Sequence, residues 1–372
     1  MDMRLYRMEL YKLLYKKIFR FGLLAVLGIL LAYFLLVSVG EERTMIDGEV
    51  YTGFAAVRED RRITEKFRGV LTDEKGRQII EQYGFPSKVE ENYGGFRDEN
   101  YLNGFVTEQL GNGYYFSWDD YQISTALQPL AESGLGAAAR AAGREVLLDY
   151  AEGWGVFLDL LQLGMILGSA LIVTVVSPVF SEEHQTKMST LLLASRNGRE
   201  GAAFAKEAAA FTAAALIYAA TAAAAFSMTG LVYGFRGGSC MSGMVLTPHG
   251  LNTALAFTLK PVAWAAFLML AVDFLALMTL CAMTLCVSAH QKTAFHTAVL
   301  TLAAWAAPLL LRILFGGAGY LLACGTPMFL VMTGVLTEWY SVLFLPAGIA
   351  VCILAASTLS GWNTWRKSEA DV

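Results

Sequence analysis

Charged residues are scarce in this chain of 372 residues: Asp, Glu, Lys and Arg make up only 16% of it, against about a quarter in a typical soluble domain. The shortage is uneven, because about two-thirds of the acidic residues lie between Glu41 and Glu152. This split predicts a polar segment inserted into a membrane protein. The net charge of −4 leaves no basic face to neutralise phosphates, so no nucleic acid is expected as a partner.

Histidine and cysteine are both missing from residues 40–155. A catalytic site would need a nucleophile–base pair or a metal cluster, for which these side chains are common choices. The scattered carboxylates of this segment are therefore interpreted as a solvated surface, and no enzymatic activity is expected of the chain. The five cysteines elsewhere fit no zinc spacing. Cys240 and Cys324 both fall in predicted outer loops, where a disulfide between them is one alternative.

Six apolar stretches are each long enough to cross a bilayer as a helix, which takes about 20 residues. Because the backbone cannot leave polar groups unpaired in lipid, and because the stretches lack the alternation of barrel strands, helices are expected. The fold class is therefore an all-α polytopic membrane protein. The predicted membrane-spanning helices cover residues 19–39, 156–180, 207–235, 262–289, 295–315 and 342–361. The first is expected to be a retained anchor, since it exceeds the roughly 7–15 apolar residues of a signal peptide.

Lysine and arginine gather in alternate loops. The enriched segments are residues 1–18, 181–206, 290–294 and 362–372. By contrast, residues 236–261 contain only two such side chains and residues 316–341 contain none. The positive-inside rule then predicts that both termini are cytoplasmic and that residues 40–155 form an extracytoplasmic domain.

The polar segment mixes aromatic and turn residues and is predicted to be an α+β or mainly helical domain. One amphipathic helix is expected from Asp73 to Tyr83, and a second helical pattern runs from Ala126 to Tyr150 into the second span. Near the other end, residues 316–341 are apolar but interrupted by Gly and Pro, which favours broken helices that re-enter from the outer face. The third span is rich in small residues and is expected to pack inside the bundle.

The loop at residues 181–206 has the most informative local pattern. Glu182 and Glu183 are predicted to start a short helix, where the positive end of the helix dipole favours carboxylates. Met188, Leu191 and Leu192 recur at helical spacing as one apolar edge. Such a helix could bind a soluble partner or could lie on the lipid headgroups, and its periodicity alone favours neither.

This loop resembles the inner-loop pattern of type 2 ABC transporter permeases, the membrane subunits of bacterial ATP-driven exporters. The residues that carry the resemblance are Phe180, Glu182, Glu183, Thr186, Leu191, Leu192, Leu193, Ser195, Arg196, Gly198, Arg199 and Lys206. The layout is similar too: that family has a cytoplasmic amphipathic helix, here residues 1–18, then six spans, a coupling helix after the second span and broken outer helices. The chain departs from the pattern at Lys187, where many members have Gly.

The resemblance implies a transport function shared with partners. A separate ATPase subunit would bind ATP and Mg²⁺ and dock on the coupling loop, and a second permease chain, identical or related, would complete the pathway in the bacterial cytoplasmic membrane. This chain would bind no cofactor, in keeping with its lack of a Gly-rich phosphate-binding loop. The implied coupling residues are Glu182, Glu183, Thr186, Met188, Leu191, Leu192, Arg196 and Arg199. No residue pattern specifies the substrate.

Among the charged residues inside predicted spans, two need an explanation. Asp273 lies near the middle of the fourth span, where a charge exposed to lipid is costly, so it must face protein or water. A structural hydrogen bond to a neighbouring helix is the favoured interpretation, and a substrate or proton pathway is the alternative. Arg312 is close enough to the outer end of the fifth span to reach the headgroups.

Two other functions compete with the permease. An ion-coupled secondary transporter working through Asp273 would require internal repeats, which the sequence lacks, and several carboxylates near the middle of spans, where Asp273 stands alone. A membrane sensor would use the extracytoplasmic domain to bind a ligand, but it would need a cytoplasmic output domain.

Overall fold

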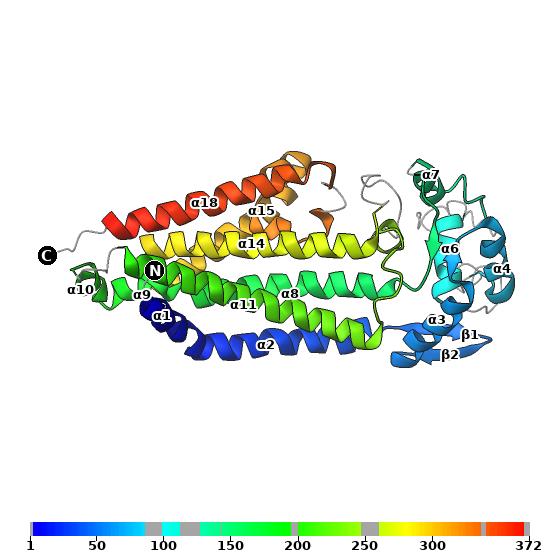
Figure 1. The fold of residues 1–372 in the computed structure, drawn as a ribbon, viewed down its shortest axis with the longest axis horizontal. Coiled ribbons are helices and arrows are strands. Elements are labelled where there is room, and N and C mark those ends of the chain that lie inside the picture. Colours follow the sequence, from blue (N-terminus) through cyan, green and yellow to red (C-terminus); the bar gives the residue numbers. More distant parts are fainter. Residues whose placement is uncertain are drawn as a thin grey trace.

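The computed structural model describes residues 3–85, 99–111, 127–141, 143–194, 200–246, 260–335 and 340–367. Long helices run side by side along the molecule, and a lobe of shorter helices and strands closes one end (Figure 1). The first helix, α1 (Met3–Tyr15), and the last residues of α18 (Phe344–Lys367) lie at the opposite end.

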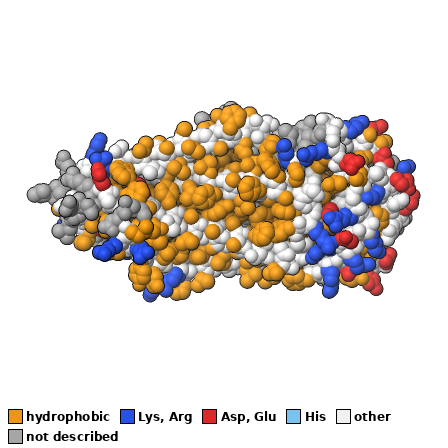
Figure 2. All heavy atoms as spheres, in the orientation of Figure 1, with side chains coloured by type: hydrophobic (Ala, Val, Ile, Leu, Met, Phe, Trp, Pro, Cys, Tyr) orange, Lys and Arg blue, Asp and Glu red, His pale blue; other side chains and the backbone are white. Residues whose placement is uncertain are grey.

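Six helices of the described residues are long and apolar enough to cross a membrane. The long helices are α2 (Lys17–Tyr33) with a π-helical turn (Phe34–Ser38), α8 (Glu152–Val176) with α9 (Pro178–Gln185), α11 (Gly201–Val232), α14 (Val262–His290), the first part of α15 (Ala294–Ala323), and α18. Their hydrophobic side chains form a broad belt that stops where the charged lobe begins (Figure 2). The predicted class, an all-α polytopic membrane protein, agrees with this arrangement.

Helices α8 and α14 form the centre of the bundle, whereas α2, α15 and α18 expose most of their side chains. Helix α11 is intermediate, because its alanine-rich face packs against α1, α8 and α14 while its other face is open. Its exposed large side chains are Phe204, Leu216, Phe226 and Leu231. The prediction that this helix packs inside the bundle is therefore wrong for one face: small residues allow close approach, but only on the side where they lie.

The predicted break after the fifth span falls within α15. Gly316 has a non-helical conformation (φ 54°, ψ −127°), which a residue without a Cβ adopts easily. Beyond it, the short helix α16 (Pro327–Leu330) is buried against α14 and α15. The side-chain amide oxygen of Gln162 on α8 accepts hydrogen bonds from the Thr333 backbone N–H (2.8 Å) and hydroxyl (3.1 Å). This segment thus folds back onto the bundle.

The lobe is the described part of the chain between α2 and α8. Strands β1 (Arg43–Ile46) and β2 (Glu49–Thr52) form an antiparallel hairpin. Its turn is Asp47-Gly48, and both residues have positive φ (55° and 77°), as a type I′ turn requires and as Asp-Gly favours. Strand β3 (Gly69–Val70) pairs with β4 (Leu147–Leu148). The lobe therefore contains two separate two-stranded sheets among its helices.

Four helices complete the lobe and surround its own hydrophobic core: α3 (Phe54–Phe67), α4 (Asp73–Tyr83), α6 (Tyr101–Leu110) and α7 (Gly134–Ala141). The amphipathic helix expected from Asp73 to Tyr83 is present as α4. It begins after Thr72, whose hydroxyl accepts a hydrogen bond from the Lys75 backbone N–H at 3.2 Å.

The long helix predicted from Ala126 to Tyr150 is wrong. Only α7 is helical in the described part of this range, and Leu147–Leu148 form strand β4. Gly143 has φ 60°, a conformation that ends a helix, and β4 then pairs across the lobe with β3. Tertiary strand pairing therefore overrides the local helical pattern.

The two cysteines considered for a disulfide are both buried and free. Cys240 belongs to the core of the lobe, whereas Cys324 belongs to the core of the bundle. The disulfide is therefore not formed.

The lobe contains a buried carboxylate at Asp60, which is only 6% exposed. Its Oδ1 accepts hydrogen bonds from the Thr44 hydroxyl (2.9 Å) and the Tyr101 backbone N–H (3.0 Å). Burial raises the pKa of Asp60 to about 7, and these hydrogen bonds offset only part of the shift. Because the folded pKa exceeds the unfolded value, the stabilisation by this group is complete below about pH 4 and is lost as the pH rises toward 7.

The substitution Asp60→Asn is expected to remove this pH dependence. At pH 8 the variant should be more stable than the wild type, by about 1.4 kcal/mol for each unit by which the pKa is raised, whereas at pH 4 the two should be alike. Hydrogen exchange of the α3 and α6 amides, compared between variant and wild type at each pH, measures the effect. Glu81→Gln, at an exposed position on α4, is the control and should change protection at neither pH. Equal protection of Asp60→Asn and wild type at pH 8 would contradict the prediction.

Candidate functional site

The predicted coupling segment lies at the end of the bundle away from the lobe, in α9 and α10 (Met188–Ala194) (Figure 1). Ser177 keeps helical dihedrals (φ −48°, ψ −42°), and Pro178 occupies the first position of α9, where a missing N–H is tolerated. Glu182 and Glu183 therefore lie in the second half of α9. The prediction that they start a short helix is wrong, because the helix restarts at the proline.

A buried ion network joins three helices at this end. The Lys206 side chain on α11 is only 2% exposed, and its Nζ lies 2.8 Å from Oε1 of Glu183 on α9 and 3.2 Å from Oε2 of Glu9 on α1. Lys12 Nζ lies 2.9 Å from Glu9 and 3.8 Å from Glu183. Partial burial lowers the pKa of Lys12, but the hydrogen bond to Glu9 and the nearby carboxylates outweigh it and raise that pKa. Within this network of Glu9, Lys12, Glu183 and Lys206, each charge therefore has an opposite charge beside it.

Glu182 behaves differently from its neighbour. Its side chain is half exposed and forms an ion pair with Lys16 at the surface. Glu183, by contrast, is 16% exposed and is held by Lys206. Of the two predicted partner-binding carboxylates, only Glu182 is therefore accessible. Glu183 instead neutralises the buried Lys206 of the same chain, and leaving Lys206 without an opposite charge would be unfavourable.

Helix α1 packs along α11 and supplies the third side of the network. Leu13 is buried in the bundle core, and the Tyr6 hydroxyl lies 3.0 Å from the Thr212 hydroxyl of α11. Glu9 is carried on the same helix and so reaches Lys206. The ion pairs of Lys206 with Glu9 and Glu183 were not predicted from the sequence. The available signal was a single lysine within the alanine-rich start of the third span.

The junction of α8 and α9 is fixed by α14 and α18. The Ser288 hydroxyl donates to the Ser177 carbonyl (2.7 Å) and accepts from the backbone N–H groups of Phe180 (3.0 Å) and Ser181 (3.1 Å). The fully buried ring of Trp365 on α18 packs 5.1 Å from the Phe180 ring. These contacts were not predicted either, because nothing in the local sequence around Ser288 or Trp365 indicates their partners.

The link between α9 and α10 is a tight turn. The Thr186 hydroxyl donates to the Glu182 carbonyl at 2.8 Å, which ends α9. Lys187 then has φ 59°, in the left-handed region. Residues with a Cβ rarely adopt this backbone conformation, whereas Gly adopts it freely. The departure from the family pattern thus falls at a position whose backbone conformation favours Gly.

Helix α10 presents part of its predicted apolar edge. Met188 is 45% exposed, whereas Leu192 is half buried and packs against the bundle core. Leu191 belongs to α10, and Arg196 and Arg199 lie outside the described residues. Among the large apolar side chains of this helix whose burial is described, Met188 is therefore the exposed one that a partner could cover.

Asp273 and Arg312, the two intramembrane residues singled out from the sequence, occupy separate environments. Asp273 is fully buried in α14, and neither of its carboxylate oxygens has a hydrogen-bond partner among the described residues. The favoured prediction of a structural hydrogen bond from Asp273 to a neighbouring helix is therefore wrong. Arg312 is exposed on α15, four residues before the break at Gly316. A buried carboxyl without a hydrogen-bond partner is unfavourable. Packing alone therefore does not explain why an aspartate occupies position 273.

Within the described ranges, no three His, Cys, Asp or Glu side chains are grouped so that they could hold a metal ion. Comparison with protein-family models finds no match, and comparisons with curated proteins and with solved structures find none either. The ion network, the exposed face of α10 and the unpaired Asp273 are thus the features on which a function can be argued.

Proposed function

We propose that this chain is the membrane-spanning permease subunit of an ATP-binding cassette exporter, with ATP hydrolysed by a separate subunit. The observation that carries the proposal is the family-like inner loop, which joins the second and third of six helices able to cross a bilayer. Lys187 adds support, because its φ of 59° fits a position where many family members have Gly.

The proposed orientation puts α10 in the cytoplasm and the lobe outside a bacterial cytoplasmic membrane. It is supported by two independent observations. The lysine- and arginine-rich loops are those that the positive-inside rule assigns to the cytoplasm. In addition, α1, α10 and the end of α18 share one end of the bundle, opposite the lobe (Figure 1).

The proposed mechanism uses α9 and α10 as the contact with the ATPase. ATP and Mg²⁺ bind to that subunit, and its closure presses on α10 near Met188. Because Glu183 is paired with Lys206 and Glu182 with Lys16, the displacement passes to α11 and to the junction of α1 and α2 together. Tilting of this unit against a second permease chain, of identical or related sequence, would alternate access to the pathway between them.

Met188→Asp is expected to release the ATPase subunit. A carboxylate placed in an apolar interface without a partner costs about 2 kcal/mol or more, which corresponds to more than tenfold weaker binding. The measurement is recovery of the ATPase when the tagged full chain is purified from its native membrane in mild detergent. Val50→Asp is the matched control, because Val50 is 50% exposed on β2 at the opposite end of the molecule. Recovery with wild type and Val50→Asp but not with Met188→Asp supports the proposal, and failure of the wild type to recover any ATPase refutes it.

One observation favours a second candidate function, ion-coupled transport. Asp273 is fully buried near the middle of α14 with both oxygens unpaired, which is the environment of a group that binds and releases a proton or cation. Against it, no three His, Cys, Asp or Glu side chains of the described residues are grouped so that they could hold a metal cation.

A further inference from the structure

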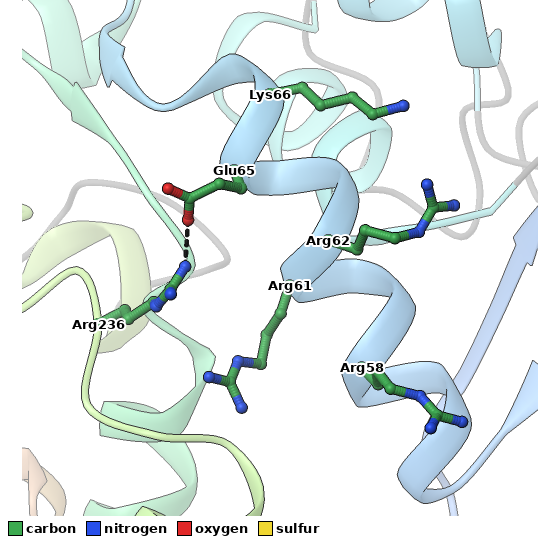
Figure 3. Close-up of a pocket in the computed structure, with 6 residues that line it drawn as sticks. All are labelled: Arg58, Arg61, Arg62, Glu65, Lys66 and Arg236. Carbon is green, nitrogen blue, oxygen red and sulfur yellow. Dashed lines mark hydrogen bonds and ion pairs between the residues drawn. The ribbon is translucent and has the colours of Figure 1, made fainter.

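An open cavity of about 620 Å³ lies where the lobe meets the bundle (Figure 3). Five of the six residues that line it come from α3, and the sixth, Arg236, follows α11. Five of the six are cationic, and Glu65 is the one carboxylate. The lining residues are Arg58, Arg61, Arg62, Glu65, Lys66 and Arg236.

The protein neutralises only part of this charge. Arg236 forms an ion pair with Glu65 (Figure 3), and Arg62 forms one with Glu59 outside the cavity at 2.6 Å. Arg58 and Lys66 have no hydrogen bond or ion pair within the described part of the chain. The cavity therefore keeps a net positive charge that the described residues do not neutralise.

The spacing of the cations along α3 concentrates this charge. Arg58, Arg62 and Lys66 follow one another at four-residue intervals, so they lie on one side of the helix as neighbours. Like charges at this spacing repel each other and destabilise a helix. A bound anion would remove that repulsion, whereas packing within the protein does not.

The cavity lies at the edge of the hydrophobic belt. Arg61 Nη1 donates to the carbonyl of Val232, the last residue of a candidate membrane span, at 3.3 Å. Gly234 lies beside this guanidinium, since a Cβ there would be in ordinary van der Waals contact with Arg61 Nη2 at 3.4 Å, and its φ of 71° is one that Gly adopts readily. Lysine and arginine side chains gather along the same boundary (Figure 2). This is the level at which phospholipid phosphates lie in a bilayer.

We propose that this cavity binds the phosphate of an anionic phospholipid in the leaflet next to the lobe. Arg58 and Lys66, which the described residues leave unpaired, supply most of the attraction, and Arg62 lies between them although it is paired with Glu59. The planar guanidinium groups can each give two parallel N–H···O bonds to phosphate oxygens. A lipid is favoured over a soluble anion because Arg61, which lines the same cavity, contacts the last residue of a candidate membrane span and so puts the cavity at the level of lipid phosphates. The proposal depends on the membrane placement and is independent of the ABC permease proposal.

The test is retention of phosphatidylglycerol by the full chain in mild detergent, measured by native mass spectrometry. The site variant combines Arg58→Gln, Arg62→Gln and Lys66→Gln, all at exposed positions. The control removes the same charge elsewhere on the lobe, through Arg77→Gln, Arg140→Gln and Arg144→Gln, also at exposed positions. Thermal midpoints of both variants establish that they fold.

The site variant is expected to retain roughly tenfold less phosphatidylglycerol than wild type, because each cation near the lipid surface adds attraction. The control should retain as much as wild type, and phosphatidylcholine should be retained weakly by all three. Equal retention by the site variant and the control would overturn the proposal. Displacement of the lipid by millimolar inorganic phosphate, with phosphate alone raising the thermal midpoint, would instead identify a soluble anion as the ligand and overturn the lipid assignment.

Discussion

Replacing Lys206 with Met is expected to destabilise the chain by about 3–5 kcal/mol, because it leaves buried carboxylates without their cation. Glu9 and Glu183 are 17% and 16% exposed, so water replaces little of the lost interaction. Lys12 would remain near Glu9, but it is half exposed and lies 3.8 Å from Glu183. The lost stability should therefore come mainly from the contact between α9 and α11.

The measurement is unfolding of the full chain in mixed micelles, and the matched control is Lys292→Met. Lys292 is exposed at the same end of the molecule, so its substitution should change the free energy of unfolding by less than about 0.5 kcal/mol. Adding Glu9→Gln and Glu183→Gln to Lys206→Met should restore most of the stability, since replacing a whole buried ion cluster is often nearly neutral. A small effect of Lys206→Met, or no rescue by the triple variant, would show that the network contributes little.

Asp273→Ala is expected to stabilise the bundle, by about 2 kcal/mol or more. An unpaired polar group in an apolar environment costs roughly 2–7 kcal/mol, and Ala removes it while leaving only a small cavity. The same unfolding assay measures the change. Thr279→Ala is the control on the same helix: the Thr279 hydroxyl donates to the Leu275 carbonyl at 2.8 Å, so its loss should not stabilise the chain.

Destabilisation by Asp273→Ala would mean that the carboxyl has a partner in the working protein, such as an ion or a second chain. Proton uptake into liposomes that contain the full chain then separates the two proposed functions. Uptake by wild type that is lost in Asp273→Asn would support the ion-coupled transporter, and absence of uptake in both would leave the ATPase-driven permease as the better account.

The long helices could be predicted from the sequence because each depends on the composition of its own residues. About 20 apolar residues suffice to predict a span, whatever its neighbours are. The helix predicted from Ala126 to Tyr150 failed because Leu147–Leu148 pair with β3, which lies far away in the chain. Local periodicity contains no information about such a partner.

The candidate site shows the same limit. The four-residue spacing of Arg58, Arg62 and Lys66 is visible in the sequence, but the approach of Arg61 to the end of α11 is not. Likewise, Lys206 was recognised as part of a motif, yet its buried contact with Glu9 spans 197 positions of the chain. Spans follow from composition, whereas these contacts depend on how the spans pack.

Helix α11 is held by polar contacts at both ends, so it connects the α1 and α9 end of the bundle with the lobe. Lys206 holds its first turns to α1 and α9, while Arg61 holds the Val232 carbonyl at its end. The Tyr233 hydroxyl, one residue further, donates to the carbonyl of Ser38, the last residue of the π-helical turn after α2. With 32 residues, α11 is about 48 Å long, so a tilt of roughly 5° about one end moves the other by about 4 Å. A change of a few degrees in the angle of α11 at the end held by Lys206 therefore becomes a displacement of several ångströms at the end next to the lobe.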